Sequence, residues 1–325
     1  MLKTTTVGSF PKSEALKAAR AKVRRAQMDK QQLKSLEQAE TKEWIRIQQQ
    51  IGLDILVDGE MYRGDMATYF AEYLEGFTIS SLVRSYGNRY YRKPIAVKPI
   101  RWKGPITVEW FKFAQALTKK PVKGMLTGPY TMMDWSFDEH YPNRRAFCLA
   151  LAEAIHEEVK ALEAAGAKFI QIDEPAVSTR VEEVELAVEA MKIVTKGVRV
   201  QTGTHICYGD FEKVYPQILN LAVDQIDLEF TNSNFGLLDL IRKIPFTKEV
   251  GFGVLDVHSH RVESVEQIKA AIHRALEVFT PEKLYIDPDC GLKTRLKEES
   301  VAKLTNMVAA VREVRKEIGV SVLDS

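Results

Sequence analysis

The sequence contains little cysteine, no long apolar run and no large excess of charge of either sign. Its three cysteines, Cys148, Cys207 and Cys290, are too few and too scattered for a disulfide framework. No apolar segment is long enough to cross a bilayer, and the first ten residues lack the apolar centre of a signal peptide. A net charge of +2 gives no reason to expect nucleic acid or a membrane as a partner. We therefore expect a cytoplasmic protein.

Short β-rich runs alternate along the chain with amphipathic helical stretches, a pattern that favours a parallel sheet. The β-rich runs span residues 4–10, 53–60, 121–129, 167–176, 198–207, 223–230, 249–259 and 282–291. Their number and the chain length of 325 residues predict the α/β class and a (β/α)8 TIM barrel. We expect residues 1–325 to form a single catalytic domain.

Two segments fall outside this repeat. Residues 12–50 are rich in charge and predict an N-terminal helical segment of one or two exposed helices. Residues 61–120 predict a longer insertion after the second strand. Neither contains a low-complexity linker, so we expect no domain boundary there.

Polar or reactive residues close nearly every β-rich run. They are Ser9, Asp58, Glu60, Thr127, Asp173, Glu174, His205, Cys207, Asp227, Glu229, His258, Asp287 and Cys290. An α/β barrel carries its active site at the carboxyl ends of its strands. These side chains are therefore predicted to converge at one mouth.

The pair His205 and Cys207 in THICYGDF suggests a metal site, because residues two apart in a strand point the same way. The pair alone is weak evidence, since buried free cysteines are common. Cys290 ends the last run, and a carboxylate ends a neighbouring run at Asp227 or Glu229, which share one strand phase. Together these N, O and S ligands suit zinc. For Cys290 the alternative is a turn residue.

The predicted ligand set points to thiol chemistry. Two thiolates and one carboxylate outweigh the two positive charges of zinc, whereas hydrolytic zinc sites use mainly histidine ligands. A thiolate-rich site is a poor Lewis acid, but it can still deprotonate an incoming thiol. Cys148, by contrast, lies between apolar neighbours in a helical stretch, which indicates packing.

Glu60 and Asp173 are carboxylates suited to an α-ammonium group, and the backbone of VGSFP with the Ser9 hydroxyl suits an α-carboxylate. The alternatives are a helix cap for Ser9 and salt bridges for the two acids. Together with a thiol-activating metal, these groups suggest an amino acid that carries a thiol.

Eight segments closely resemble the carboxyl-terminal half of cobalamin-independent methionine synthase. They are TTTVGSFP, DGEMYRGDM, GPITVEW, KPVKGMLTGPYTMMDWSF, IQIDEPA, THICY, VLDVHS and DPDCGLKTR, and the resemblance covers essentially the entire chain. It implies a zinc-dependent methyltransferase that converts L-homocysteine to L-methionine. The zinc ligands that it implies are His205, Cys207, Glu229 and Cys290. Glu229 is thereby preferred over Asp227.

The resemblance also implies roles for further residues. Homocysteine contacts are implied for Ser9, Glu60 and Asp173, with the backbone of Val7 nearby. His258 resembles the catalytic histidine, which supplies a proton to the departing methyl carrier; the alternative is a histidine that merely orients a loop. Trp135 resembles the indole that stacks on the pterin of the methyl donor, and its alternative is core packing.

Two departures from the family bear on the methyl donor. Full-length members carry a second, amino-terminal barrel that helps to hold a polyglutamyl tail, whereas this sequence begins directly at TTTVGSFP. Residues 98–102 read KPIRW where the family has Gly-Asp-Ile-Ser-Arg. Short relatives are thought to use methylcobalamin or a corrinoid protein, so we expect methylcobalamin, free or on a corrinoid carrier, as the donor. The alternative is 5-methyltetrahydrofolate or its polyglutamate.

Other functions compete with homocysteine methylation. A methyltransferase for another thiol, such as coenzyme M, would keep the metal but not the amino-acid contacts. A non-catalytic barrel would use its zinc for structure alone. A decarboxylase on the same fold would not need the His-x-Cys, Glu and Cys set.

Overall fold

The computed structural model describes residues 1–84, 90–207, 209 and 211–319. The chain divides into two compact units. The first comprises Met1–Tyr62, Phe113–Lys123 and Asp227–Ser325, and the second comprises Arg63–Lys112 and Gly124–Ile226.

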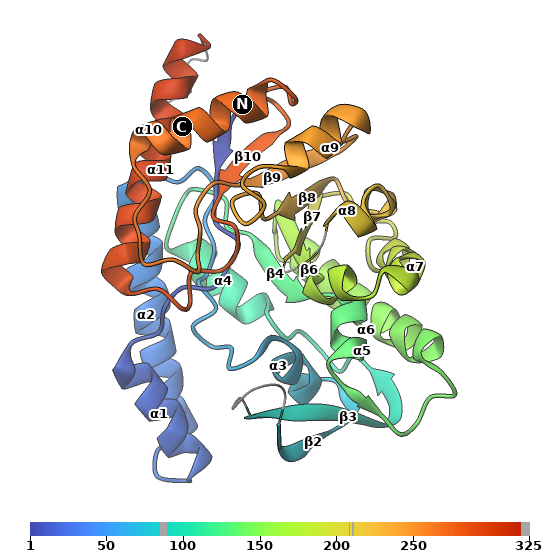
Figure 1. Ribbon diagram of the computed structural model, residues 1–325. Helices are drawn as coiled ribbons and strands as arrows, with labels where there is room; N and C mark the ends of the chain where they lie inside the picture. Colours follow the sequence, from blue (N-terminus) through green and yellow to red (C-terminus); the bar gives the residue numbers. More distant parts are fainter. Residues whose placement is uncertain (85–89, 208, 210, 320–325) are drawn as a thin grey trace. The chain divides into compact units, whose positions relative to one another are not determined.

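The main sheet consists of short strands with the order β1-β10-β9-β8-β7-β6-β4 (Figure 1). Their bounds are β1 Lys3–Thr4, β4 Gly124–Thr127, β6 Phe169–Asp173, β7 Gln201–Ile206, β8 Gln225–Leu228, β9 Glu249–Gly253 and β10 Leu284–Asp287. Pairing is parallel wherever the register is resolved, as at Lys3 opposite Tyr285 and Gly124 opposite Ile170. Several strands are buried along their entire length, which explains their nearly continuous apolar sequences.

The second predicted run is held by backbone hydrogen bonds rather than by a long ladder. Ile55 donates to the carbonyl of Thr4 at 3.1 Å, and Leu56 donates to that of Pro121 at 2.9 Å. A parallel bridge joins Leu56 to Val122, two residues before β4. The run therefore lies between β1 and the segment that leads into β4, as the eighth strand of a barrel does.

Helices follow most strands. In the first unit they are α1 Glu14–Arg24, α2 Lys30–Ile51, α9 Leu237–Lys243, α10 Val265–Leu276 and α11 Lys297–Glu317. In the second unit they are α3 Met66–Tyr73, α5 Pro129–Asp134, α6 Arg144–Ala164, α7 Val184–Val194 and α8 Phe211–Val214, with the 3-10 turns η1 Pro175–Thr179, η2 Val181–Glu183 and η3 Gln217–Asn220. α4, Val108–Ala116, has residues in both units. Local capping sets several starts: the side chain of Ser264 begins α10 with a full capping box.

The predicted N-terminal helical segment consists of α1 and α2, but the expectation that it is exposed is wrong for α2. Trp44 of α2 is 2% exposed and stacks on Phe10, with ring centroids 4.1 Å apart. One face of α2 is therefore part of the core of the first unit.

The predicted insertion contains α3 and a β-hairpin that the sequence pattern does not predict. Its strands are β2 Glu75–Arg84 and β3 Tyr90–Arg101, which pair antiparallel. β3 also pairs with β5, Phe137–Asp138, to give a separate three-stranded sheet. Across the described ranges, no helix combines the length and the apolar character that a membrane span requires.

Candidate metal and substrate site

His205 and Cys207 lie at the carboxyl end of β7, and both are buried. Residues of one neighbouring segment, 174–178, donate hydrogen bonds to the backbone carbonyls of both residues. The N–H of Glu174 donates to the carbonyl of His205 at 3.0 Å, and the Ser178 hydroxyl donates to that of Cys207 at 2.8 Å. These bonds fix the strand end from which the imidazole and the thiol project.

Cys290 follows β10, and the preceding residue anchors its loop. The buried carboxylate of Asp289 accepts hydrogen bonds from the backbone N–H groups of Phe230 and Thr231, at 3.1 and 3.2 Å, and from the Thr231 hydroxyl. Burial raises the pKa of Asp289 to about 7, although the bonds from Thr231 act in the opposite direction. A Cβ at Gly253 would lie 2.2 Å from Asp289 Oδ1, so only glycine allows this approach.

The two acids that sequence phase could not separate have different surroundings. Asp227 packs against the backbone of β9, where a Cβ at Gly251 would lie 2.6 Å from its Cγ. Glu229 follows β8, is 2% exposed, and accepts a hydrogen bond of 2.8 Å from the side-chain amide of Asn232.

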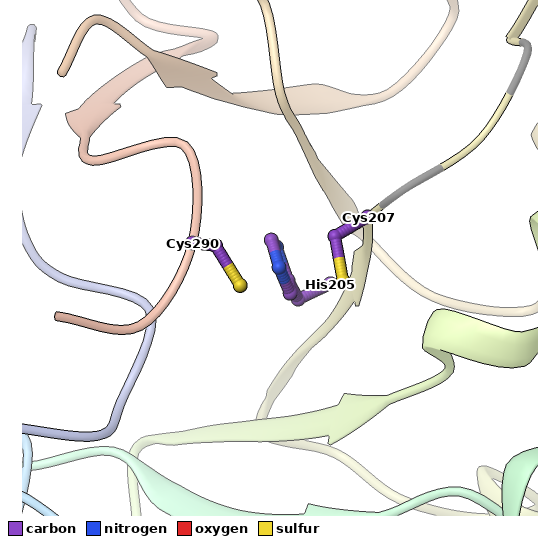
Figure 2. Close-up of side chains that lie close together, drawn as sticks. All are labelled: His205, Cys207 and Cys290. Atoms are coloured by element: carbon purple, nitrogen blue, oxygen red, sulfur yellow. The ribbon is translucent and has the colours of Figure 1, made fainter. Parts of the chain in front are cut away.

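The ligand atoms of His205, Cys207 and Cys290 all lie within 4.8 Å of one another (Figure 2). Ligands bound to one zinc ion at about 2.0–2.3 Å are themselves separated by somewhat less than 4 Å, so the group is close to that arrangement. One imidazole and two thiols are a donor set that zinc accepts. Glu229 is not part of this three-residue group.

Ser9 lies against the turn that carries Cys290. The N–H of Leu292 donates to the Ser9 carbonyl at 2.8 Å, and a Cβ at Gly291 would lie 2.1 Å from Ser9 Oγ. Val7, two residues earlier, is 5% exposed. The loop that contains Val7 and Ser9 therefore packs directly against the turn that carries Cys290.

The segment with Glu60 also contacts the loop after β1. The N–H of Phe10 donates to the Gly59 carbonyl at 3.1 Å. Gly59 and Glu60 both have left-handed backbone conformations, with φ of 79° and 59°. For a non-glycine residue this conformation is uncommon, and it is stabilised here by the bond from the Glu60 N–H to Asp58 at 2.8 Å.

Asp173 and Glu174 end β6 and are both buried. Asp173 accepts a bond of 2.7 Å from the Gln171 side chain, which orients its carboxylate. Glu174 accepts bonds from the backbone N–H groups of Tyr130 and Thr131, at 3.0 and 2.7 Å. Burial raises the pKa of Glu174 to about 7, while these bonds oppose the shift.

Trp135 and His258 are more accessible than His205, Cys207 and Glu229. Trp135 follows α5 and is half-buried. His258 is exposed, and its backbone N–H donates to the Asp256 carboxylate at 2.8 Å. The fully buried ammonium of Lys303 donates to the carbonyls of Asp256 and Arg261 on either side of this loop.

Cys148 has none of these site features. It is fully buried on α6, and burial raises the pKa of its thiol well above the usual range. Such a thiol is a poor nucleophile, as expected of a packing residue.

Comparison with known proteins identifies the family of this chain. Residues 2–313 match the family described as "Cobalamin-independent synthase, Catalytic domain". The chain belongs to the cobalamin-independent methionine synthase family. The predicted membership is thereby confirmed over nearly the entire chain.

Three relatives of the methionine synthase family illustrate the match. The "5-methyltetrahydropteroyltriglutamate–homocysteine methyltransferase" of Bacillus velezensis is 42% identical over 328 residues, which are 97% of this chain and 43% of that protein. The chain thus spans less than half of this relative's length. The "Methionine synthase" of Pyrococcus furiosus is 40% identical over 319 residues, covering 98% of this chain and 94% of that one.

One solved structural relative is a B12-independent methionine synthase from Shewanella sp. W3-18-1, in complex with selenomethionine. It is 28% identical, has a TM-score of 0.86, and covers 99% of this chain and 100% of that chain. The predicted (β/α)8 barrel of the methionine synthase type is confirmed by this match.

Sequence reasoning missed five residues that support the predicted site residues. Ser178, Asn232 and Asp289 lie beside the metal-ligand candidates, Gln171 orients Asp173, and Lys303 holds the loop of His258. Asp289 had a sequence signal, since it flanks Cys290 in DPDCG. The others act through loop and helix geometry that spacing along the chain does not encode.

Proposed function

We propose that this chain transfers a methyl group to the thiol of L-homocysteine, forming L-methionine, with a 5-methyltetrahydropteroyl glutamate as the donor. The proposal is carried by the group of one imidazole and two thiols at the ends of β7 and β10. The names of the relatives supply the reaction, because the Bacillus velezensis protein is named as a homocysteine methyltransferase. We further propose that residues 1–325 act as one catalytic domain.

His205, Cys207 and Cys290 would hold a zinc ion, and Glu229 completes the proposed ligand set. Zinc bound there would favour the thiolate form of a coordinated thiol near neutral pH. The protein's own contribution is to fix these side chains, through the bonds at the end of β7 and the anchor of Asp289.

Homocysteine would be held by its amino-acid end. Asp173, oriented by Gln171, and Glu60 supply carboxylates for the α-ammonium group. The Ser9 hydroxyl and the backbone around Val7 supply donors for the α-carboxylate. The Shewanella relative was solved with selenomethionine, which differs from methionine by selenium in place of sulfur, and this supports an amino-acid site.

For the donor, the comparisons favour the alternative expectation over the main one. The Bacillus velezensis relative is named for a methyltetrahydropteroyltriglutamate, and the matching family is described as cobalamin-independent. Methylcobalamin or a corrinoid carrier as the donor is therefore not supported. We propose that Trp135 stacks on the pterin ring of the tetrahydropteroyl donor.

Methyl transfer leaves the donor nitrogen with the electron pair of the broken C–N bond, so that nitrogen needs a proton. We assign this proton to His258, whose exposure allows it to exchange protons with solvent. The sulfur of homocysteine supplies the electron pair of the new C–S bond, and methionine is released.

The deciding experiment measures methionine formed by the purified, zinc-loaded protein from homocysteine. The donors compared are mono- and triglutamyl 5-methyltetrahydrofolate and methylcobalamin. Turnover with methylcobalamin alone would overturn the proposed donor. Methylation of coenzyme M without methylation of homocysteine would overturn the proposed acceptor.

A structural role of zinc is tested separately. If homocysteine binds to the metal, the zinc X-ray absorption spectrum should gain a sulfur neighbour when homocysteine is added. An unchanged spectrum at saturating homocysteine would contradict catalytic zinc.

A further inference from the structure

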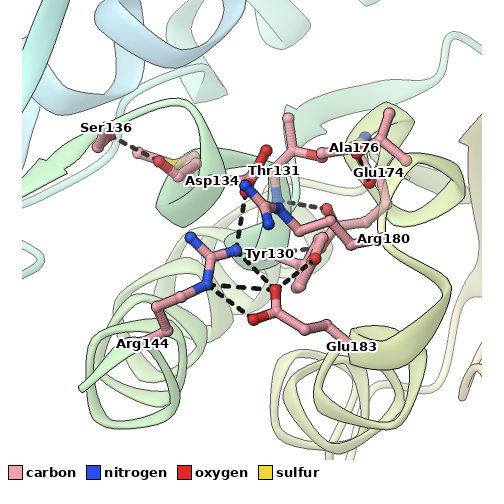
Figure 3. Close-up of polar contacts among 11 residues, drawn as sticks. Tyr130, Thr131, Asp134, Ser136, Arg144, Glu174, Ala176, Arg180 and Glu183 are labelled. Carbon is pink, nitrogen blue, oxygen red and sulfur yellow. Dashed lines mark hydrogen bonds and ion pairs between the residues drawn. The ribbon is translucent and has the colours of Figure 1, made fainter.

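Glu174 connects several elements of the second unit (Figure 3). It follows Asp173 at the end of β6, directly precedes η1, and is fully buried. The reaction proposed above gives it no role. A buried carboxylate is costly unless its oxygens are satisfied, so its partners are informative.

The carboxylate of Glu174 fixes the start of α5. Its oxygens accept the N–H groups of Tyr130 and Thr131, which lie in the first helical turn and have no partner within the helix. A Cβ at Gly128 would lie 2.2 Å from Glu174 Cδ, so glycine is required for this approach. The Thr131 hydroxyl also accepts the N–H of Ala176, at 3.2 Å.

The same segment holds the end of β7 on its other side. The backbone N–H of Glu174 donates to the carbonyl of His205 at 3.0 Å. Ser178, at the far end of the segment, donates to the carbonyl of Cys207 at 2.8 Å. Residues 174–178 are thus bonded both to α5 and to the strand that carries two metal-ligand candidates.

The opposite end of α5 is tied by ion pairs. Asp134 accepts from Arg144 at 2.8 Å and from Arg180 at 2.9 Å, and Arg144 also pairs with Glu183 (Figure 3). The arginines are half-exposed, so each pair contributes little by itself. Because both ends of this short helix are held, the backbone of Trp135 directly after it is held as well.

We propose that Glu174 is a positioning residue that sets Trp135 and the pair His205 and Cys207 in one fixed arrangement. The inference rests on the proposed function, in which Trp135 receives the methyl donor and the pair contributes to the acceptor site. Methyl transfer requires the two reacting atoms to approach within a fraction of an ångström of a productive geometry. A single buried residue that is bonded to α5 through its carboxylate and to β7 through its backbone N–H supplies that alignment.

The direct test is Glu174→Gln. The amide keeps the shape of the side chain but offers one acceptor oxygen, and its NH2 group faces a backbone N–H, so one bond to α5 is lost. We expect zinc affinity to fall by up to about tenfold, because the segment 174–178 that loses a bond to α5 also holds the carbonyls of His205 and Cys207. We also expect the KM for the methyl donor to rise by a similar factor, while kcat changes less.

A second readout needs neither zinc nor turnover. In protein labelled with 5-fluorotryptophan, the 19F resonance of Trp135 is identified by its loss in Trp135→Phe. We expect Glu174→Gln to shift this resonance. If the purified protein shows no methyltransferase activity, the proposed function is contradicted. The role of Glu174 is still tested, because zinc affinity and the Trp135 resonance do not depend on turnover.

Glu158→Gln is the matched control. Glu158 is also fully buried and accepts backbone N–H groups, from Ile106 at 2.9 Å and Thr107 at 2.7 Å, but it holds residues 106–107 rather than α5. We expect this variant to lose comparable thermal stability while zinc affinity and the Trp135 resonance stay unchanged.

The proposal is overturned if Glu174→Gln leaves both readouts unchanged, or if Glu158→Gln changes them equally. Should Glu174→Gln fail to fold, Thr131→Val decides, because it is nearly isosteric and removes the hydroxyl that bonds to Ala176. It is expected to shift the Trp135 resonance and to weaken zinc binding by a smaller factor. No change in either would equally overturn the role of this segment.

Discussion

The side-chain amide of Asn232 donates a hydrogen bond of 2.8 Å to Glu229, three residues earlier in the loop after β8. Glu229 is almost completely buried, and the bond engages one of its two carboxylate oxygens. Such a bond restricts the rotation of a carboxylate and is a common way to orient a metal ligand. Asp227 instead packs against the backbone of β9 at Gly251.

Asn232→Ala is therefore expected to weaken zinc binding by about tenfold, because the Glu229 carboxylate loses its orienting partner. Competition with a chromophoric chelator measures this affinity. Asn306→Ala is the control, since Asn306 also bonds through its amide, at 2.7 Å, but to the carbonyl of Glu263. Equal affinities of the Asn232 variant and the parent protein would argue against Glu229 as a ligand.

Replacement of Cys207 or Cys290 by serine is expected to abolish stoichiometric zinc binding, because a hydroxyl does not supply the thiolate that zinc prefers. Cys148→Ala should retain the metal and lose only about 1–2 kcal/mol of stability through the small cavity it leaves. Metal content after dialysis, measured by mass spectrometry on folded protein, distinguishes these cases. Loss of zinc from the Cys148 variant would show that the metal lies elsewhere.

Asp173→Asn and Glu60→Ala are expected to raise the KM for homocysteine by about ten- to a hundredfold, since each removes a charge-assisted bond to the α-ammonium group. The KM for a simple alkanethiol, which has no such group, should stay nearly constant. Steady-state kinetics with both acceptors measures the ratio. An equal loss for the two thiols would contradict the assignment of these carboxylates.

The burial of Glu37 in α2 is expected to make the free energy of unfolding depend on pH. Burial raises its pKa to about 7, and this outweighs the attraction of Arg20, whose guanidinium lies 2.7 Å away. Between about pH 4.5 and 7 the folded protein keeps a proton that the unfolded chain has lost, so this contribution to stability falls as the pH rises.

Glu37→Gln removes this titration and should reduce the loss of stability between pH 5 and pH 8 by about 1–3 kcal/mol. Urea unfolding of both proteins at the two pH values measures the difference. Lys269→Gln is a control for the loss of an ion pair at the surface, because Lys269 pairs with Glu313 on the neighbouring helix. The same pH dependence in the Glu37 variant and the parent would contradict the raised pKa.

The barrel and the grouping of three candidate metal ligands could be predicted because they depend on simple periodicities. Strands buried on both faces have short, apolar sequences, and parallel strands place their carboxyl ends at one edge of the sheet. From that rule, His205 and Cys207 were predicted to lie close to Cys290, although His205 and Cys290 are 85 residues apart in the sequence. The choice of Glu229 over Asp227 needed the resemblance to a family, since strand phase treats the two acids alike.

The remaining features depend on contacts between distant residues. The β2–β3 hairpin contains Pro94 and Pro99 and several basic residues, which weaken the usual signal of a strand. The burial of α2 follows from the stacking of Trp44 on Phe10, and charge composition alone suggested the opposite. The methyl donor was expected from departures from the family pattern, such as KPIRW at residues 98–102, and these are a weaker guide than the names of the relatives.

Lys303 restricts where the loop of His258 can rearrange. Its ammonium is completely enclosed and bonds to carbonyls at both flanks of the loop, Asp256 and Arg261. Withdrawal of either carbonyl would deprive an enclosed positive charge of an acceptor, at a cost of about 1–3 kcal/mol. Backbone movements that bring the imidazole toward a ligand are therefore limited to residues 257–260. The ends of this short loop stay fixed.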